Sequence, residues 1–224
     1  YEKSFGVDFS KSNLPANKEI HALDPHPQKE DNKITRLAKL REEILKCKQC
    51  SLSGSRKNVV FGIGNPHADL MFVGEAPGYY EDQKGEPFVG KAGELLTKII
   101  NAIDLKREEV YIANILKCRP PENRNPNADE IILCSPFLTK QIEIIKPKII
   151  CALGTFAIQT LLKTTESIGN LRGKFYDYNG IKLIATYHPA YLLRNTQDKR
   201  KTWEDMKKVR DFLKDVRIRD KMLK

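Results

Sequence analysis

Four cysteines are the residues whose type and spacing point most clearly to chemistry. Cys47 and Cys50 form a close pair, and Cys118 and Cys134 follow much later in the chain. A tight pair with two distant cysteines is a pattern by which a fold closes four thiolates around one soft metal centre. Zinc and an iron–sulfur cluster both accept four thiolates, and the spacing alone does not choose between them. Buried cysteines without a metal are the plainer alternative, which the polar residues between Cys47 and Cys50 disfavour.

A second candidate site follows the apolar run at residues 69–73. Residues 74–78 read GEAPG, and this segment cannot continue a strand because Pro77 lacks an N–H and Gly78 permits a positive φ. The backbone N–H groups of such a turn can bind a carbonyl or phosphate oxygen, although an ordinary tight turn is the alternative. Phe88 follows in a loop, where it would either stack on a nucleic-acid base or fill the core.

Two more polar side chains stand at the ends of predicted strands. Asn114 ends the strand predicted at residues 110–115, and its amide offers one acceptor and two donors, which match a base edge that shows both kinds. His188 follows the strand predicted at residues 181–187, where an imidazole can stabilise an oxyanion. The plainer alternatives are a buried asparagine that caps a turn and a structural histidine.

Composition indicates the kind of partner. The 224-residue chain carries 39 Lys and Arg against 29 Asp and Glu, a net charge of +10, which favours a polyanion such as nucleic acid over the plainer reading of a lysine-rich soluble protein. No run is long and apolar enough to span a bilayer, and we expect no membrane association. The start of the chain lacks the pattern of a secretory signal, so we expect a cytoplasmic protein with reduced thiols. Cys151, inside an apolar run, is expected to be a core residue.

The elements that must position these residues alternate between strand and helix. Strands are predicted at residues 69–73, 110–115, 148–153 and 181–187, and helices at 34–45, 93–103, 128–145, 155–162 and 199–216. Pro136 is expected to kink or restart its helix, and Thr155 to cap the next one. The pattern predicts an α/β fold with three αβα layers around a central, mainly parallel four-stranded sheet. Ligands of such folds bind at the carboxyl ends of the strands, where the polar motifs lie.

The domain organisation that we expect is simple. Residues 1–32 are polar, interrupted by prolines and predicted to form a flexible arm, residues 33–217 form one domain, and residues 218–224 form a basic tail. We expect a monomer.

The motifs taken together resemble one family. Residues 74–78 (GEAPG), 85–90 (GEPFVG), 113–114 (AN) with 117–121 (KCRPP), and 188–194 (HPAYLLR) accompany the four cysteines. This combination resembles the uracil-DNA glycosylase superfamily, specifically its family 4 enzymes. The resemblance implies a [4Fe–4S] cluster on the four cysteines. It also implies that uracil from single- or double-stranded DNA enters a pocket, where hydrolysis of the N-glycosidic bond leaves an abasic site and initiates base-excision repair.

The resemblance also implies roles for pocket residues. Phe88 would stack on uracil, Asn114 would bind its O4 and N3 edge, and Glu81 would line its C5 side. The catalytic group would comprise Asn114, His188 and the segment Glu75-Ala76, with His188 and the backbone of that segment surrounding O2, where negative charge develops. Family 1 enzymes of this superfamily place an aspartate where Ala76 stands. Glu75, Glu81 and Asn123 are therefore candidates to position the water, with Glu75 ranked first.

The remaining implied roles concern DNA. Leu193 and Arg194 would fill the gap left by the flipped nucleotide, and Arg119, Asn123 and Arg124 would face DNA. The mechanism would be monofunctional, without a lysine Schiff base. The alternative is a non-catalytic iron–sulfur DNA-binding module on the same fold.

Overall fold

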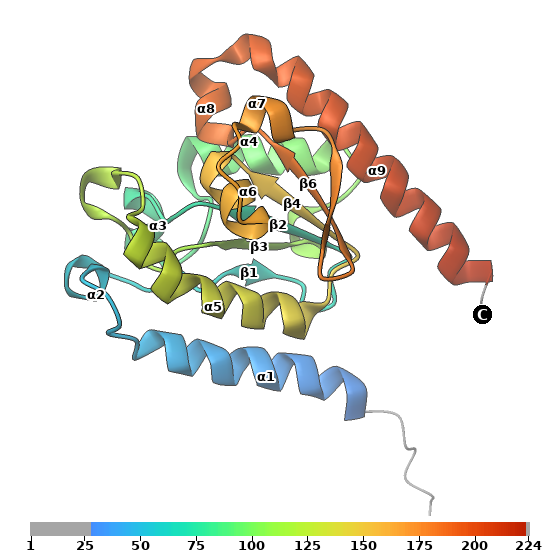
Figure 1. The fold of residues 1–224 in the computed structure, drawn as a ribbon. Helices are drawn as coiled ribbons and strands as arrows, with labels where there is room; N and C mark the ends of the chain where they lie inside the picture. Colours follow the sequence, from blue (N-terminus) through green and yellow to red (C-terminus); the bar gives the residue numbers. More distant parts are fainter. Residues whose placement is uncertain (1–27, 223–224) are drawn as a thin grey trace, which may run out of the picture.

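A six-stranded sheet lies at the centre of the protein (Figure 1). The computed structural model describes residues 28–222, with side chains from residue 32 onward. The strand order is β1-β3-β2-β4-β6-β5, and the four central strands are parallel while the two edge strands run antiparallel to their neighbours. The strands are β1 Ile63–Gly64, β2 Leu70–Gly74, β3 Tyr111–Asn114, β4 Ile149–Leu153, β5 Phe175–Tyr178 and β6 Ile181–Thr186.

The predicted α/β class is confirmed, and the four predicted strands form the parallel centre of the sheet. The predicted number of strands was wrong, because two edge strands were missed. β1 has only two residues, too few to show a period. β5 pairs with β6 across the turn at Asn179 and Gly180, whose φ angles are 51° and 82°. Asn-Gly with both φ angles positive is a favoured hairpin turn, so the sequence did contain a signal for β5.

Helices cover both faces of the sheet, which gives three layers (Figure 1). The longer helices are α1 Gln28–Leu45, α4 Gly90–Asn101, α5 Ala128–Ile145, α6 Thr155–Leu162 and α9 Lys199–Met222, and the shorter ones are α2 Leu52–Ser55, α3 Tyr79–Lys84, α7 Ile168–Leu171 and α8 Pro189–Arg194. One core cluster joins α1, α5 and α6 to one face of the sheet, and the other joins α4 and α9 to the opposite face.

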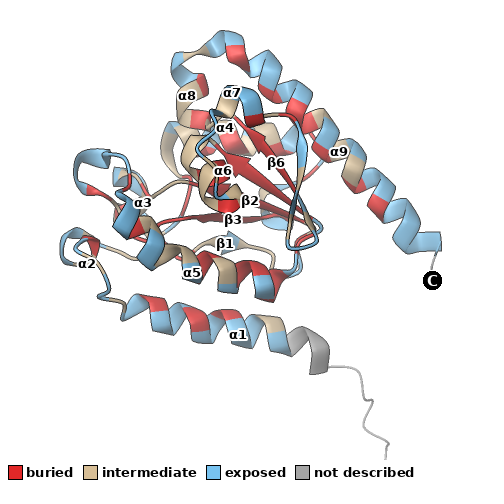
Figure 2. Ribbon diagram, in the orientation of Figure 1, coloured by how far each residue is buried: buried red, intermediate tan, exposed pale blue. Residues whose placement is uncertain are grey.

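Successive residues of the central strands contribute to opposite core clusters. In β4, Ile150 and Ala152 belong to the cluster under α5 and α6, whereas Ile149, Cys151 and Leu153 belong to the cluster under α4 and α9. Strands buried on both faces read as continuous apolar runs, which is why these strands were readable from the sequence. Figure 2 shows the central strands as mainly buried and the outward faces of the helices as exposed. Cys151 is fully buried, as predicted.

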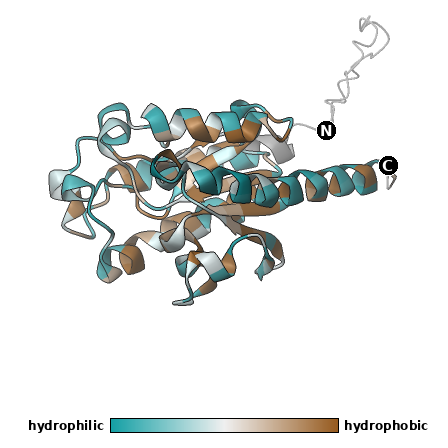
Figure 3. Cartoon of the chain, turned by 90° about the horizontal axis from the view of Figure 1, so that it is seen from above, coloured by the Kyte–Doolittle hydropathy of each residue, from teal (hydrophilic) through white to brown (hydrophobic). Residues whose placement is uncertain are grey.

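The two terminal helices extend further than predicted. α1 begins at Gln28, so residues 28–32 are helical rather than part of an arm, and residues 1–27 of the predicted arm lie outside the described residues. α9 continues to Met222, so residues 218–222 of the predicted basic tail prolong the helix. Seen in Figure 3, α9 mixes hydrophilic and hydrophobic residues along its length, and its buried positions include Met206, Val209 and Leu213.

Two local predictions about helices need correction. The prediction that the helix restarts at Pro136 is wrong, because α5 runs without a break from Ala128 to Ile145, whereas a kink at Pro136 stays a prediction. The proline removes one hydrogen bond to the carbonyl of Ile132, a residue on a solvent-facing turn, where water can replace the missing donor. The N-cap of α6 is Gly154 at φ 89°, and Thr155 is the first helical residue instead of the cap. None of the helices among residues 28–222 combines the length and apolar character needed to cross a bilayer.

Candidate active site and cysteine centre

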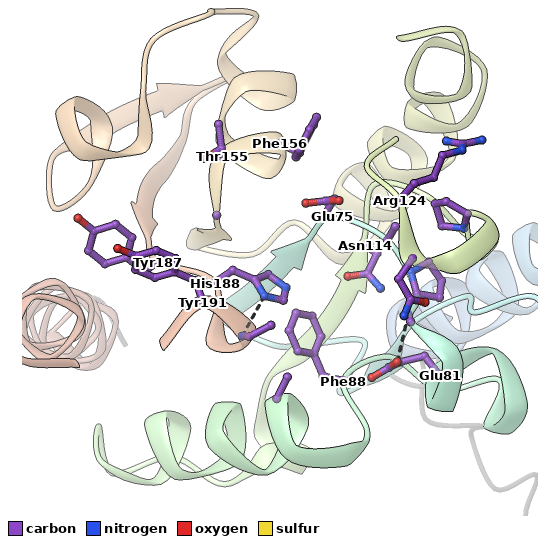
Figure 4. Close-up of a pocket in the computed structure, with 18 of the residues that line it drawn as sticks. Glu75, Glu81, Phe88, Asn114, Arg124, Thr155, Phe156, Tyr187, His188 and Tyr191 are labelled. Carbon is purple, nitrogen blue, oxygen red and sulfur yellow. Dashed lines mark hydrogen bonds between the residues drawn. The ribbon is translucent and has the colours of Figure 1, made fainter. Parts of the chain in front are cut away.

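A cleft of about 730 Å³ opens where the parallel strands end. Glu75 follows β2, Asn114 is the last residue of β3, Gly154 follows β4, and His188 follows β6, and all four line the cleft. Phe88 lines it from the loop that precedes α4 (Figure 4). The structure therefore brings together the pocket residues that the sequence predicted, from segments more than a hundred residues apart.

Phe88 is held rigidly at the floor of the cleft. Its φ is 53°, a left-handed conformation that is costly for a bulky residue and persists only where the surroundings enforce it. Arg107 donates to the carbonyls of Pro87 and Phe88 at 2.9 and 3.0 Å. On the other side, a Cβ at Gly93 would lie 1.8 Å from the Phe88 carbonyl oxygen, so only glycine lets α4 approach so closely. The backbone that carries the ring is thus held in place by contacts within the protein.

Asn114 and Phe88 both lie directly over Gly74. A Cβ at Gly74 would come within 2.4 Å of Asn114 Oδ1 and 2.7 Å of the Phe88 ring. Asn114 is 2% exposed, and its Oδ1 has no hydrogen-bond partner within the described part of the chain. A buried acceptor without a donor costs about 1–3 kcal/mol, so this oxygen is suited to a donor that a ligand brings. The predicted alternative, an asparagine that caps a turn, leaves the unpaired oxygen unexplained.

His188 presents a neutral imidazole to the cleft. Its Nδ1 accepts a hydrogen bond from the backbone N–H of Ala190 at 3.1 Å, as the N-cap of α8 (Figure 4). The proton of the neutral ring is therefore on Nε2, which makes Nε2–H a donor. Burial, with the nearby charge of Arg194, lowers the pKa of His188 to about 4. Its ring centroid lies 5.4 Å from that of Phe88, so both rings face the same part of the cleft.

Glu75 is the carboxylate that remains available. Burial raises the pKa of Glu75 to about 7, and its side chain has no hydrogen-bond partner among the described residues. Its backbone is fixed, because the carbonyls of Gly74 and Glu75 accept from the N–H groups of Ile115 and Leu116, each at 3.0 Å. A carboxyl group with a pKa near neutral can take a proton from water at physiological pH.

Glu81 lines the cleft, but both of its oxygens are already engaged. One accepts from the N–H of Gly78 and the other from the N–H of Val89, each at 3.0 Å. These bonds tie the turn after β2 to the loop that carries Phe88, and Figure 4 shows the bond between Glu81 and Gly78. Because Glu81 is committed to the backbone, it is a weaker candidate than Glu75 for holding a water. Its expected place beside the C5 position of a base stays a prediction.

Two of the three residues predicted to face DNA after β3 line the cleft, and the third, Arg119, bonds to one of them. Arg119 donates to Asn123 Oδ1 at 2.8 Å, which engages the third candidate for holding the water. Asn123 and Arg124 line the cleft, and Arg124 forms a bidentate pair with Glu130 at 2.6 and 2.9 Å. Arg124 thus anchors its own loop to α5, a role that sequence reasoning did not foresee.

The predicted wedge residues lie at the end of α8. Arg194 lines the cleft, whereas Leu193 lies beside it with its side chain 42% exposed. The DNA contacts of these rim residues stay predictions.

The four predicted cysteines gather at one small hollow beside α5, between apolar walls that include Ile44, Leu133 and Phe137. Arg56 donates to Cys118 Sγ at 3.1 Å, and the N–H of Lys117 donates to Cys134 Sγ at 3.3 Å. Burial raises the pKa of Cys134 to about 11, which the neighbouring Lys117 opposes. Within the described part of the chain, no three His, Cys, Asp or Glu side chains converge on a point that would hold a single metal ion.

Comparison with known proteins establishes the family. A model of the Uracil DNA glycosylase superfamily matches residues 61–207. The chain belongs to the uracil-DNA glycosylase superfamily. It is 50% identical over 183 residues to a type-4 uracil-DNA glycosylase of Saccharolobus solfataricus, which covers 78% of this chain and 85% of that relative. A type-4 uracil-DNA glycosylase of Thermotoga maritima is 46% identical over 177 residues, covering 77% of this chain and 92% of that one.

A type-5 enzyme is less similar to this chain than the two type-4 enzymes are. The type-5 uracil-DNA glycosylase of Pyrobaculum aerophilum is 32% identical over 152 residues, covering 59% of this chain and 66% of that protein. The resemblance to the family 4 enzymes is therefore confirmed.

Several residues that shape the cleft of this protein were not singled out from the sequence. Arg107 fixes Phe88 from a 3-10 turn, and no local pattern marks that function. Tyr187 lines the cleft, stacked on Tyr191 at 4.9 Å and facing Arg172, whose Cζ lies 5.4 Å from the Tyr187 ring centroid. Gly154 was read only as the end of a strand, yet a Cβ there would lie 3.0 Å from Cβ of His188. A glycine immediately after a buried strand is a recognisable sign of a close backbone approach.

Proposed function

We propose that this protein is a monofunctional uracil-DNA glycosylase, which hydrolyses the N-glycosidic bond of uracil in single- and double-stranded DNA. The observation that carries the proposal is the unpartnered Oδ1 of Asn114, buried between the fixed ring of Phe88 and the cleft. The relatives named type-4 uracil-DNA glycosylase support the same reaction.

Uracil recognition follows from hydrogen-bond complementarity. Asn114 Oδ1 accepts from the N3–H of uracil, and its amide group donates to O4. Cytosine presents the opposite arrangement, an acceptor at N3 and a donor at C4, so it leaves the amide mismatched. The Phe88 ring stacks on the flipped base, which contributes about 1–3 kcal/mol. Flipping costs least where uracil is mispaired or already unpaired.

The chemistry requires an anion and a water. As the C1′–N1 bond breaks, its electron pair moves onto the uracil ring, and negative charge develops on O2. His188 Nε2–H donates to that oxygen, assisted by backbone N–H groups at Glu75 and Ala76. The Glu75 carboxylate holds a water against C1′ and accepts its proton as the C1′–O bond forms. The step leaves an abasic site, a uracil anion and a proton on Glu75, and neutral uracil forms when the anion takes up a proton and Glu75 loses its own.

We further propose that Cys47, Cys50, Cys118 and Cys134 hold a [4Fe–4S] cluster. Four thiols around one hollow, with N–H donors on two sulfurs and apolar walls, suit thiolate ligation. A cubane is wider than one ion, so thiols that do not converge on a single point are compatible with it. When bound, the cluster would cross-link the segment between α1 and α2, the loop after β3 and α5. The four ligands therefore anchor the loop that carries Arg119 and Asn123.

The first test is an excision assay. Anaerobically purified protein is incubated with a labelled oligonucleotide that contains one uracil and then treated with alkali, with a thymine oligonucleotide as the control. We expect alkali-dependent cleavage at uracil only. Uncleaved DNA that is nevertheless bound by cluster-loaded protein would favour the non-catalytic DNA-binding module. Iron, sulfide and zinc contents, with absorbance near 400 nm, decide the identity of the metal centre.

A further inference from the structure

Lys117 is a buried lysine that does not line the cleft and is not one of the proposed cluster ligands. It is 1% exposed, and its Nζ donates to the backbone carbonyl of Asn114 at 2.7 Å and to Gln141 Oε1 at 2.6 Å. Both partners are neutral. The ion pairs among the described residues do not include Lys117. A buried ammonium without a counter-charge is costly, so its retention calls for an explanation.

The groups near Lys117 that can carry a negative charge are thiols. Lys117 lines the cysteine hollow, precedes Cys118 in the chain and donates its backbone N–H to Cys134 Sγ. Metal ligation converts these thiols to thiolates. The negative charge of a loaded centre would therefore compensate the ammonium of Lys117 from one side, while Asn114 lies on the other.

The position of the ammonium is fixed by a hydrogen-bonded chain. Gln141 Nε2 donates to the carbonyl of Phe61 at 2.9 Å and to the hydroxyl of Tyr111 at 3.3 Å, which orients its Oε1 toward Lys117. Lys117 in turn holds the carbonyl of Asn114, the residue whose side chain faces the cleft. A shift of the ammonium would therefore move the end of β3 and the amide that it carries.

We propose that Lys117 is a positioning residue that couples uracil recognition by Asn114 to the charge of the cysteine centre. The coupling rests on the proposed function, because it presumes that Asn114 binds uracil. Thermodynamic linkage makes it reciprocal: uracil in the cleft alters the metal centre by the same factor by which the centre alters uracil affinity.

The wild-type holoprotein tests the coupling without any substitution. The probe is free uracil, and the readouts are its affinity by calorimetry and the midpoint reduction potential of the cluster with and without saturating uracil. We expect the two potentials to differ. Uracil that binds and leaves the potential unchanged would overturn the coupling alone. Uracil that does not bind to protein that excises uracil from DNA would also overturn the coupling, whereas the loss of both binding and excision would overturn the proposed function as well.

Two matched variants separate positioning from general loosening of the core. Lys117→Met keeps the chain length but removes the charge and the donor, and we expect uracil affinity to fall about tenfold, within the range for coupling substitutions. In Lys117→Met, affinity for uracil-free DNA should stay unchanged, and a chelator should remove iron faster than from the wild type. Gln141→Met removes one of the two acceptors that hold the ammonium but leaves its bond to the Asn114 carbonyl, so uracil affinity should fall less than in Lys117→Met, by at most about threefold. Equal losses of uracil affinity in both variants would overturn the proposal.

Discussion

The pH dependence of excision tests the role of Glu75 most directly. Burial raises the pKa of Glu75 from its usual 4.5 to about 7, whereas that of His188 falls to about 4. Glu75 must be ionised to accept a proton from water, and His188 must be neutral for its Nε2–H to serve beside a bonded Nδ1. Between about pH 5 and pH 9, only Glu75 of this pair changes its charge.

The magnitude follows from the fraction of ionised carboxylate. With a pKa near 7, about half of Glu75 is ionised at neutral pH and about 1% at pH 5. The excision rate should therefore be level above about pH 8 and fall about tenfold per pH unit on the acidic side. Glu75→Gln should lower the level rate by about 10²–10⁴, the usual contribution of a general base, and should abolish the acidic limb.

The assay is single-turnover excision from a single-stranded uracil oligonucleotide, with saturating protein so that binding does not shape the profile. A level wild-type profile from about pH 5 to pH 9 would refute the assignment of Glu75. The same conclusion would follow if Glu75→Gln kept an acidic limb with the wild-type midpoint, because another group would then be titrating.

The same pKa shift predicts that Glu75 favours the folded state at low pH, whereas it favours excision at high pH. The folded state binds the Glu75 proton more tightly than the unfolded chain, so this contribution to stability is fully present below about pH 4.5 and is lost as pH rises to about 7. Glu75→Gln should consequently melt at a higher temperature than wild type at pH 8, with little difference at pH 4. A lower melting temperature for the variant at pH 8 would show that ionised Glu75 is well solvated.

Four substitutions test the rest of the site. Phe88→Ala should lower kcat/KM by the loss of about 1–3 kcal/mol of stacking, and unchanged kinetics would contradict its role. Asn114→Asp removes both amide donors and should weaken discrimination of uracil from cytosine, measured with paired oligonucleotides. Gly74→Ala forces a Cβ against Asn114 and Phe88, so excision should be lost while the visible colour is kept, and wild-type activity would reject this packing. Cys118→Ala should lose iron and folded yield, whereas a stable, colourless and fully active variant would show that the centre is dispensable.

The strands and the candidate residues were predictable for related reasons. Strands buried on both faces need apolar residues throughout, so the sequence marked β2, β3, β4 and β6 without knowledge of their neighbours. Glu75, Asn114 and His188 were recognisable because each stands at or just after the end of such a strand. The edge strands β1 and β5 escaped because a half-exposed or very short strand carries little apolar pattern.

The state of each functional side chain depended on contacts between distant segments. Glu75, Glu81 and Asn123 were all candidates for holding the water, with Glu75 ranked first, as long as only their residue types were known. Folding engaged Glu81 with two backbone N–H groups and Asn123 with Arg119, and it left Glu75 half-buried and unpaired. Arg124 was diverted to Glu130 in the same way.

The sequence by itself determined the apolar strands, the turns that end them and the chemical types placed there, because these depend on local pattern and residue identity. The tertiary structure alone decided which carboxylate is free, which imidazole nitrogen bears the proton, and that a lysine lies buried between Asn114 and the cysteines. Protonation and hydrogen bonding depend on burial and on partners, and those partners come from residues far apart in the chain.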